Sequence, residues 1–149
     1  MRAVVQRVTS ASVSVDAIEV GKVKEGFLVF LGISKDDTES DANYIVDKIS
    51  HLRIFEDAMG KMNESIIDKK GEILLVSQFT LYGDVRHGRR PSFTEAAGPE
   101  QAQLLYEYVV NQCRLLGITI ATGTFQSHMM VELTNDGPVT ILLDSKKLF

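Results

Sequence analysis

The first 34 residues, MRAVVQRVTSASVSVDAIEVGKVKEGFLVFLGIS, decide the fold because they predict an uninterrupted series of strands. In Ala11–Asp16 apolar residues alternate with Ser and Asp, the period-2 pattern of a half-buried strand. Ile18–Val23 is expected to pair with it, and Arg2–Val8 is expected to form a separate strand. Gly26–Ser34 is nearly all apolar, which is typical of a central strand covered on both faces.

Two helices are predicted outside this region. Thr38 can cap the first helix, with Asp41 three residues on in a variant of the capping box. Its apolar face follows at helical spacing with Ile45, Ile49 and Leu52. Pro99 suits the first turn of a second helix, and Gly117 suits its end. The apolar stripe of this second helix consists of Ala102, Leu105, Tyr106, Val109, Cys113 and Leu116.

The remaining chain is dominated by strands. They are expected at Leu52–Glu56, Glu72–Phe79, Ile118–Phe125, Met129–Thr134 and Val139–Asp144. A turn is expected at Asp57–Gly60, another at Asn135–Pro138, and a polar loop at Gly83–Gly98. Because two helices are inserted among strands rather than alternating with them, we predict an α+β fold over one domain, residues 1–149. This fold is a mainly antiparallel rolled sheet or barrel with two principal helices packed outside.

Composition narrows the class of protein. The chain has 149 residues, 44% of them hydrophobic and 24% charged, which is typical of a globular domain. No apolar run is long enough for a membrane span, and the single cysteine cannot form an internal disulfide. These features predict a cytoplasmic protein with no membrane partner. The net charge of −4 disfavours broad nucleic-acid affinity but allows a local contact.

The common catalytic arrangements find little support in the sequence. The histidines His51, His87 and His128 are scattered, and no Gly-x-Ser-x-Gly motif is present, so nothing supports a serine triad. Cys113 falls on an apolar helix stripe, which favours a core residue over a reactive thiol. No histidine pair has metal-ligand spacing, so no metal is expected.

Two polar segments are candidates for a site. Ser77–Tyr82 (SQFTLY) ends an apolar strand, where hydroxyls and backbone N–H groups can meet a ligand, although Ser77 and Thr80 could equally bond their own turn. Asn135-Asp136-Gly137-Pro138 is ordinary turn chemistry. About 5–6% of X–Pro bonds in folded proteins are cis, so base rate alone favours a trans Gly137–Pro138 bond.

A basic loop, Arg86-His87-Gly88-Arg89-Arg90, follows the first of these segments. Three arginines in five residues are typical of a phosphate-contact patch, because a guanidinium can donate two hydrogen bonds to one phosphate. A solvated surface loop would have the same composition. Both interpretations remain open on the loop alone.

Taken together, these segments resemble the D-aminoacyl-tRNA deacylase family. The resemblance covers essentially the whole chain, from the opening MRAVVQRV and Gly26–Gly32 to the loop Gly88–Phe93. Its most specific parts are LVSQFTLY at Leu75–Tyr82 and NDGPVT at Asn135–Thr140. Two such motifs, in order and at the family's spacing, are a specific signal.

The resemblance implies a homodimeric enzyme with active sites at the subunit interface. Its substrate would be the ester between a D-amino acid and the terminal adenosine of tRNA, and it would also clear glycine misattached to alanine tRNA. It implies no metal and no organic cofactor. The Gly137–Pro138 bond would be cis, and its carbonyls would enter the partner subunit's pocket as a chiral gate that excludes L side chains.

The resemblance also implies roles for individual residues. The catalytic segment would be Ser77, Gln78, Phe79 and Thr80, with backbone N–H groups around Gln78–Phe79 as oxyanion donors. On chemical grounds Thr80 is itself a candidate nucleophile, but a supporting role is expected because the sequence shows no base to activate it. Pocket residues would be Phe125, Met129 and Asn135, and tRNA contacts would come from Arg86, Arg89 and Arg90. Many family members have Phe-Gly-Ala where this chain has Phe125-Gln126-Ser127, so its pocket wall departs from the pattern.

Two alternatives remain. A sister deacylase would act on L-alanyl-tRNA through a trans Gly–Pro bond, although Ser77–Tyr82 favours the D-specific branch. A nucleic-acid-binding module without catalysis would depend on the arginine loop alone, and the net charge of −4 argues against it.

Overall fold

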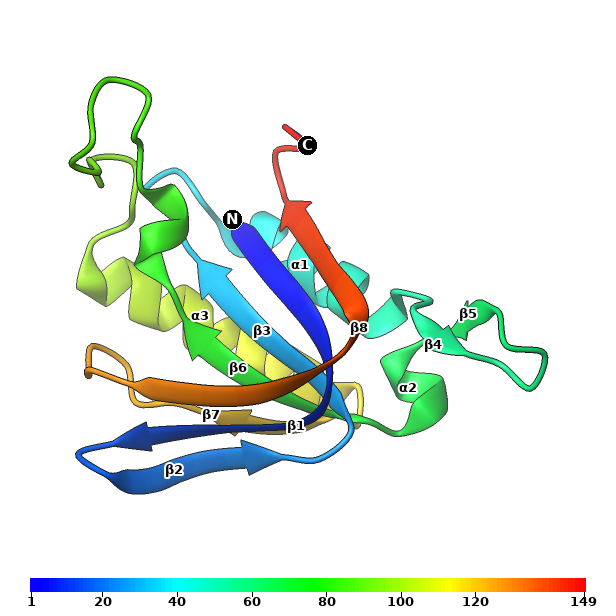
Figure 1. The fold of residues 1–149 in the computed structure, drawn as a ribbon. Coiled ribbons are helices and arrows are strands. Elements are labelled where there is room, and N and C mark those ends of the chain that lie inside the picture. The colour runs from blue at the N-terminus through cyan, green and yellow to red at the C-terminus, as the bar shows by residue number, and fades with distance from the viewer.

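A computed structural model describes all residues, 1–149. Six strands form one sheet in the order β2-β1-β3-β6-β7, with β8 paired to β1 (Figure 1). Their bounds are β1 Arg2–Val15, β2 Ile18–Val23, β3 Gly26–Gly32, β6 Glu72–Ser77, β7 Thr119–Thr122 and β8 Met130–Asp144. The three pairings of β1 are antiparallel, whereas β3–β6 and β6–β7 are parallel. The predicted rolled α+β sheet is therefore confirmed, with two parallel pairings within it.

Two long strands replace four predicted short ones. Arg2–Val8 and Ala11–Asp16 are one strand, β1, and the last two predicted strands are one strand, β8. The predicted turn at Asn135–Pro138 was therefore wrong. β8 pairs with β1 along nearly its whole length, and irregular register near Val8 accommodates the polar residues that suggested a break. Such bulges insert a residue without ending the strand.

Two principal helices, α1 (Glu39–His51) and α3 (Pro99–Leu115), pack against one face of the sheet, as predicted (Figure 1). The capping box of α1 forms as expected, since the Thr38 N–H donates to Asp41 Oδ2 at 2.9 Å. Pro99 opens α3, and Gly117 follows it with φ 82°, a left-handed conformation that glycine adopts without cost. A four-residue helix, α2 (Ile66–Lys69), was not predicted.

The other predicted strands are shorter than expected. Within Leu52–Glu56 only Phe55–Glu56 is a strand, β4, which pairs with β5 (Met62–Glu64) in a projecting hairpin (Figure 1). β6 stops at Ser77, because Phe79–Tyr82 turns into a 3₁₀ helix, η1. β7 likewise ends at Thr122 rather than at Phe125. Both shortenings leave irregular backbone at the same end of the sheet.

The apolar residues form two cores on opposite faces of the sheet. The larger has 25 buried residues between the sheet and the helices, and the smaller has seven inside the roll. β3 serves both, since Phe27 and Leu31 belong to the larger core and Leu28 to the smaller. A Cβ on Gly21 would lie 2.6 Å from the Thr122 carbonyl oxygen, so β2 approaches β7 and nearly closes the roll. No helix is long and apolar enough to cross a membrane.

Candidate active site

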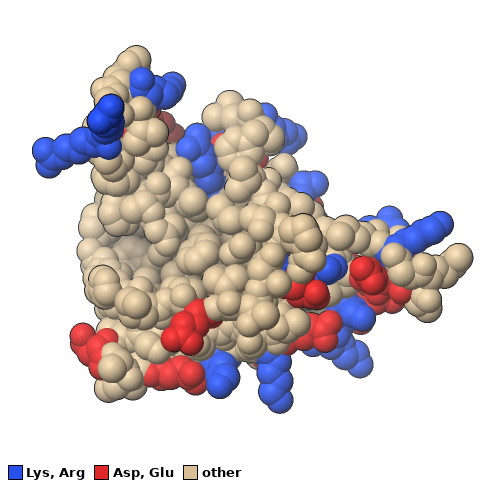
Figure 2. All heavy atoms as spheres, in the orientation of Figure 1, with Lys and Arg blue, Asp and Glu red and all other residues tan.

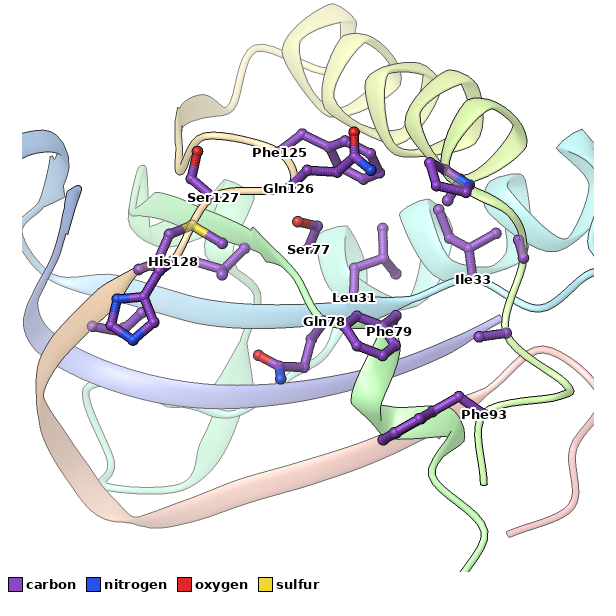
Figure 3. A pocket seen from close by; sticks show the side chains of 17 residues that line it. Leu31, Ile33, Ser77, Gln78, Phe79, Phe93, Phe125, Gln126, Ser127 and His128 are labelled. Carbon is purple, nitrogen blue, oxygen red and sulfur yellow. The ribbon is translucent and has the colours of Figure 1, made fainter. Parts of the chain in front are cut away.

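A pocket of about 650 Å³ opens at the carboxyl end of β6, between the start of α3 and the loop that joins β7 to β8 (Figure 3). Four separate segments line it: Leu31 and Ile33, Val76–Phe79, several residues of Phe93–Ala102, and Phe125–Met129 with Val131. Eleven of its 17 lining residues are hydrophobic. The pocket therefore combines an apolar wall with a few polar groups, as small-ligand sites do.

The end of β6 supplies the pocket's central polar segment. Ser77 pairs with Leu31 in the parallel ladder, and the Gln78 N–H donates to the Leu31 carbonyl at 2.8 Å. The next residue, Phe79, opens η1 and is 57% exposed. Of the two N–H groups proposed as oxyanion donors, that of Gln78 is therefore already bonded. The first N–H groups of a helix have no acceptor within it, so that of Phe79 is the better candidate.

Thr80 lies beside the pocket rather than in its wall. Its hydroxyl accepts a hydrogen bond from the Gln78 side-chain amide. No histidine or carboxylate forms a hydrogen bond with Ser77 or Thr80. The geometry thus contains no paired nucleophile and base.

Aromatic side chains make up much of the wall. Phe79 and Phe93 form an edge-to-face pair with ring centroids 5.0 Å apart. Phe125, one of the expected pocket residues, lies 6.1 Å from Tyr106, whose hydroxyl donates to the Leu75 carbonyl at 2.7 Å. Burial raises the pKa of Tyr106, so this hydroxyl stays a donor. Phe93 was not among the predicted pocket residues, although it lies in Gly88–Phe93, a segment of the family resemblance.

The loop from β7 to β8 lines the opposite side of the pocket. It brings in Phe125 and Met129, both expected there, and also Gln126, Ser127 and His128. A tight turn shapes this loop, in which the Ser127 N–H donates to the Thr124 carbonyl at 3.2 Å. At its apex Gln126 has φ 63°, in the left-handed region.

The Asn135–Thr140 segment lies within β8 and does not line this pocket. The Gly137–Pro138 bond is cis, as the resemblance implied. The Asn135 amide, expected at the pocket, instead donates to the carbonyls of Arg7 and Val139, at 3.0 Å each. Buried Arg7 in turn donates from Nε to the Asp136 carbonyl at 2.9 Å. Gly137 and Pro138 themselves are exposed.

The basic loop projects next to the pocket, and its arginine side chains stand above a hollow in the surface (Figure 2). An isolated bridge between Asp84 and Ser92 closes its base. Arg86 is bidentate on Asp84, with N–O distances of 2.9 and 2.7 Å, and these bonds hold the pKa of that carboxyl well below its usual range. Arg89 and Arg90 are exposed and have no ion-pair partner. The loop thus contains one arginine that is neutralised by an ion pair, Arg86, and two that have no ion-pair partner, Arg89 and Arg90.

The structure also bears on two other kinds of site, a reactive cysteine and a metal centre. Cys113 is buried in the larger core, and burial raises the pKa of its thiol to about 11, so it remains a protonated thiol at neutral pH. No group of three or more His, Cys, Asp or Glu side chains is arranged to hold a metal ion.

These features define a class: an α+β protein with a nearly closed sheet and an aromatic pocket beside an arginine loop. Residues 4–144 match the model of the family described as D-Tyr-tRNA(Tyr) deacylase. The chain belongs to this family.

Relatives named D-aminoacyl-tRNA deacylase match along the full length. Those of Thermosipho melanesiensis and Clostridioides difficile are 61% and 60% identical to this chain, and each alignment covers 100% of both chains. A solved structure described as c-Myc DNA Unwinding Element Binding Protein is 44% identical, with a TM-score of 0.91 over 97% of this chain and 98% of its own. A probable eukaryotic D-amino acid tRNA deacylase shares the fold at 18% identity, with a TM-score of 0.84 over 95% and 97% of the two chains.

Proposed function

We propose that this chain hydrolyses the ester of D-aminoacyl-tRNA, releasing free tRNA and a D-amino acid, and that it does so in the cytoplasm. The observation that carries the proposal is the family's Ser77–Tyr82 segment, of which Ser77–Phe79 line an aromatic pocket next to two unpaired arginines. The pocket can bind the aminoacylated end of tRNA, and the arginine loop can bind phosphates of the tRNA backbone.

The proposed reaction uses main-chain groups more than side chains. Water adds to the ester carbonyl carbon, and the carbonyl oxygen takes up negative charge, which the Phe79 N–H would stabilise. The bond to the ribose oxygen then breaks, and that oxygen leaves as a hydroxyl after taking a proton from the water that has added. The absence of a hydrogen-bonded base at Ser77 or Thr80 supports direct attack by water over an acyl-enzyme.

Rejection of L substrates would come from a second copy of the chain. In this proposal the carbonyls of the Gly137–Pro138 chiral gate enter the partner's pocket, hold the substrate amino group and leave no space for an L side chain. Glycine, which has no side chain, would pass, so glycine misattached to alanine tRNA would also be hydrolysed. The exposed position of Gly137 and Pro138, outside their own pocket, supports a role toward a partner.

We also propose that the chain is a homodimer. β8, which carries the chiral gate, exposes the apolar side chains of Met130, Leu133 and Leu142. Contact with a second copy of the chain would remove these apolar side chains from water. Sedimentation should give about twice the 16.5 kDa of one chain. A fully active monomer would contradict both the dimer and the shared site.

The proposed function is tested by release of amino acid from a set of charged tRNAs. D-Tyr-tRNA and glycyl-tRNA(Ala) should be hydrolysed, whereas L-Tyr-tRNA should survive. Hydrolysis of L-alanyl-tRNA without hydrolysis of D-Tyr-tRNA would instead identify the sister deacylase. Hydrolysis of none of the four would overturn the proposal.

A second candidate function is DNA binding. It is favoured by the 44% identity to the protein described as c-Myc DNA Unwinding Element Binding Protein and by the two unpaired arginines. A mobility-shift titration with duplex DNA at two salt concentrations tests it. Tight, specific binding without hydrolysis of D-Tyr-tRNA would favour this function over catalysis.

A further inference from the structure

Gln126 occupies an unusual backbone conformation at the pocket wall. Its φ of 63° lies in the left-handed region, which is uncommon for residues other than glycine. Four other non-glycine residues share this feature: Asp16, Ala17, Lys70 and Lys147. Gln126, like those four, lies in a turn, loop or cap, but it alone among the five lines the pocket. Costly conformations of this kind concentrate at functional sites.

The side chain of Gln126 is free to bind a ligand. Its amide forms no hydrogen bond within the protein, whereas the Gln78 amide, at another side of the pocket, is occupied by Thr80. In Figure 3 the Gln126 side chain extends from the loop beside the Phe125 ring, on the side of the pocket that faces α3. An aromatic ring and an unoccupied amide therefore lie next to each other in one wall.

This pair matches the chemistry of adenine. A carboxamide presents one acceptor and one donor side by side, which fits the exocyclic amine and N7 of adenine. An aromatic ring provides a stacking surface for the base. At the aminoacylated end of tRNA, the flat group that offers this edge is the terminal adenine.

We propose that Gln126 hydrogen-bonds the edge of the terminal adenine while the base stacks on Phe125. The inference rests on the proposed function, because it assigns one part of that substrate to one wall of the pocket. It makes Gln126 a specificity residue for the nucleotide, separate from the groups that act on the ester. The Phe79–Phe93 pair is the less suitable stacking site, since its rings pack against each other and the neighbouring Gln78 amide is occupied.

The test compares two small substrates, the D-tyrosyl esters of adenosine and of purine riboside, which lacks the exocyclic amine. The native chain should prefer the adenosine ester by about tenfold in kcat/KM, the scale of a bidentate base contact. Gln126→Gly should abolish this preference by raising KM for the adenosine ester, with kcat unchanged. Because glycine suits a left-handed backbone, this variant should fold with an equal or higher Tm.

Ala17→Gly is the matched control, because it changes another left-handed residue, in the exposed turn between β1 and β2. It should keep the preference for adenosine. An unchanged preference in Gln126→Gly, or its loss in Phe93→Leu instead, would overturn the inference while leaving hydrolysis intact. If the native chain hydrolyses neither these esters nor D-Tyr-tRNA, the proposed function fails and the inference fails with it.

Discussion

The two sequence segments that define the family lie in contrasting surroundings in this chain. Ser77–Tyr82 begins at the last residue of the buried strand β6, and its first three residues line the pocket, with Gln78 bonded to the neighbouring strand β3. Asn135–Thr140 lies on a stretch of β8 that is exposed except at Asp136 and Val139, and it lines no part of that pocket. Within one chain the two segments therefore do not meet at one site. This separation supports a site that is completed by a second copy of the chain.

The exposed segment is nevertheless held firmly. The Asn135 amide and the buried Arg7 guanidinium donate to three main-chain carbonyls around it, including that of Asp136. A Cβ on Gly137 would overlap the Val139 nitrogen and lie 2.7 Å from Asn135 Oδ1. The segment is held in this way although it does not line the pocket of its own chain. It is the order expected of a segment that must fit a partner closely.

Filling the pocket should have the largest effect. Ala102 lines it from the first turns of α3, so Ala102→Trp would occupy the space of the substrate. We expect kcat/KM for D-Tyr-tRNA to fall by at least about 100-fold, since small misplacements at a reacting centre already cost this much. Leu104→Trp is the matched control, because Leu104 lies on the same helix but is 65% exposed, and it should retain activity.

Changes to the basic loop should have an intermediate effect. Replacing Arg89 and Arg90 with Ala should raise KM for tRNA about tenfold and reduce the slope of log K against log salt by about two, one for each phosphate contact. Arg86→Ala should change both quantities less, because Asp84 already neutralises Arg86. If Arg86→Ala changed KM and the salt slope as much as the loss of Arg89 or Arg90 does, the Arg86–Asp84 ion pair would have to open on binding. The distinction between one neutralised and two unpaired arginines would then be wrong.

The smallest effect is expected for Thr80→Ala. The Thr80 hydroxyl accepts from Gln78 and has no base beside it, so kcat should stay within about tenfold of the native value. Loss of about 10⁶-fold, the scale for removal of a true nucleophile, would place Thr80 at the reaction centre. An acyl-enzyme trapped at Thr80 would give the same answer by mass spectrometry.

The sequence predicted those parts of the fold that depend on local chemistry. Thr38 and Pro99 marked helix starts, and alternation in Ala11–Val15 marked a strand, because caps and periodicity act within a few residues. The continuity of β1 and β8 depends on pairing between residues more than 100 positions apart. The polar residues within β1 and β8 therefore suggested strand ends, although each strand continues through them because it is paired with the other.

The pocket was predicted in part. Ser77–Phe79, Phe125 and Met129 line it as expected, since the family motifs contain them or lie beside them. Ala97, Ala102 and Ile33 were missed, because small or aliphatic residues carry no chemical signal and gather there only through the packing of α3 on the sheet. The left-handed backbone of Gln126 was missed as well, since glutamine gives no local indication of positive φ.

The most direct test of the shared site mixes two defective chains. Ala102→Trp blocks the pocket, and Gly137→Val displaces the chiral gate by its overlap with Val139. Each variant should be inactive alone on D-Tyr-tRNA while keeping a folded, dimeric state. After co-refolding, about half the dimers are mixed, and each mixed dimer has one intact site, so about a quarter of native activity should return. A mixture that stays inactive, although mixed dimers are shown by mass spectrometry, would contradict a site formed by two copies.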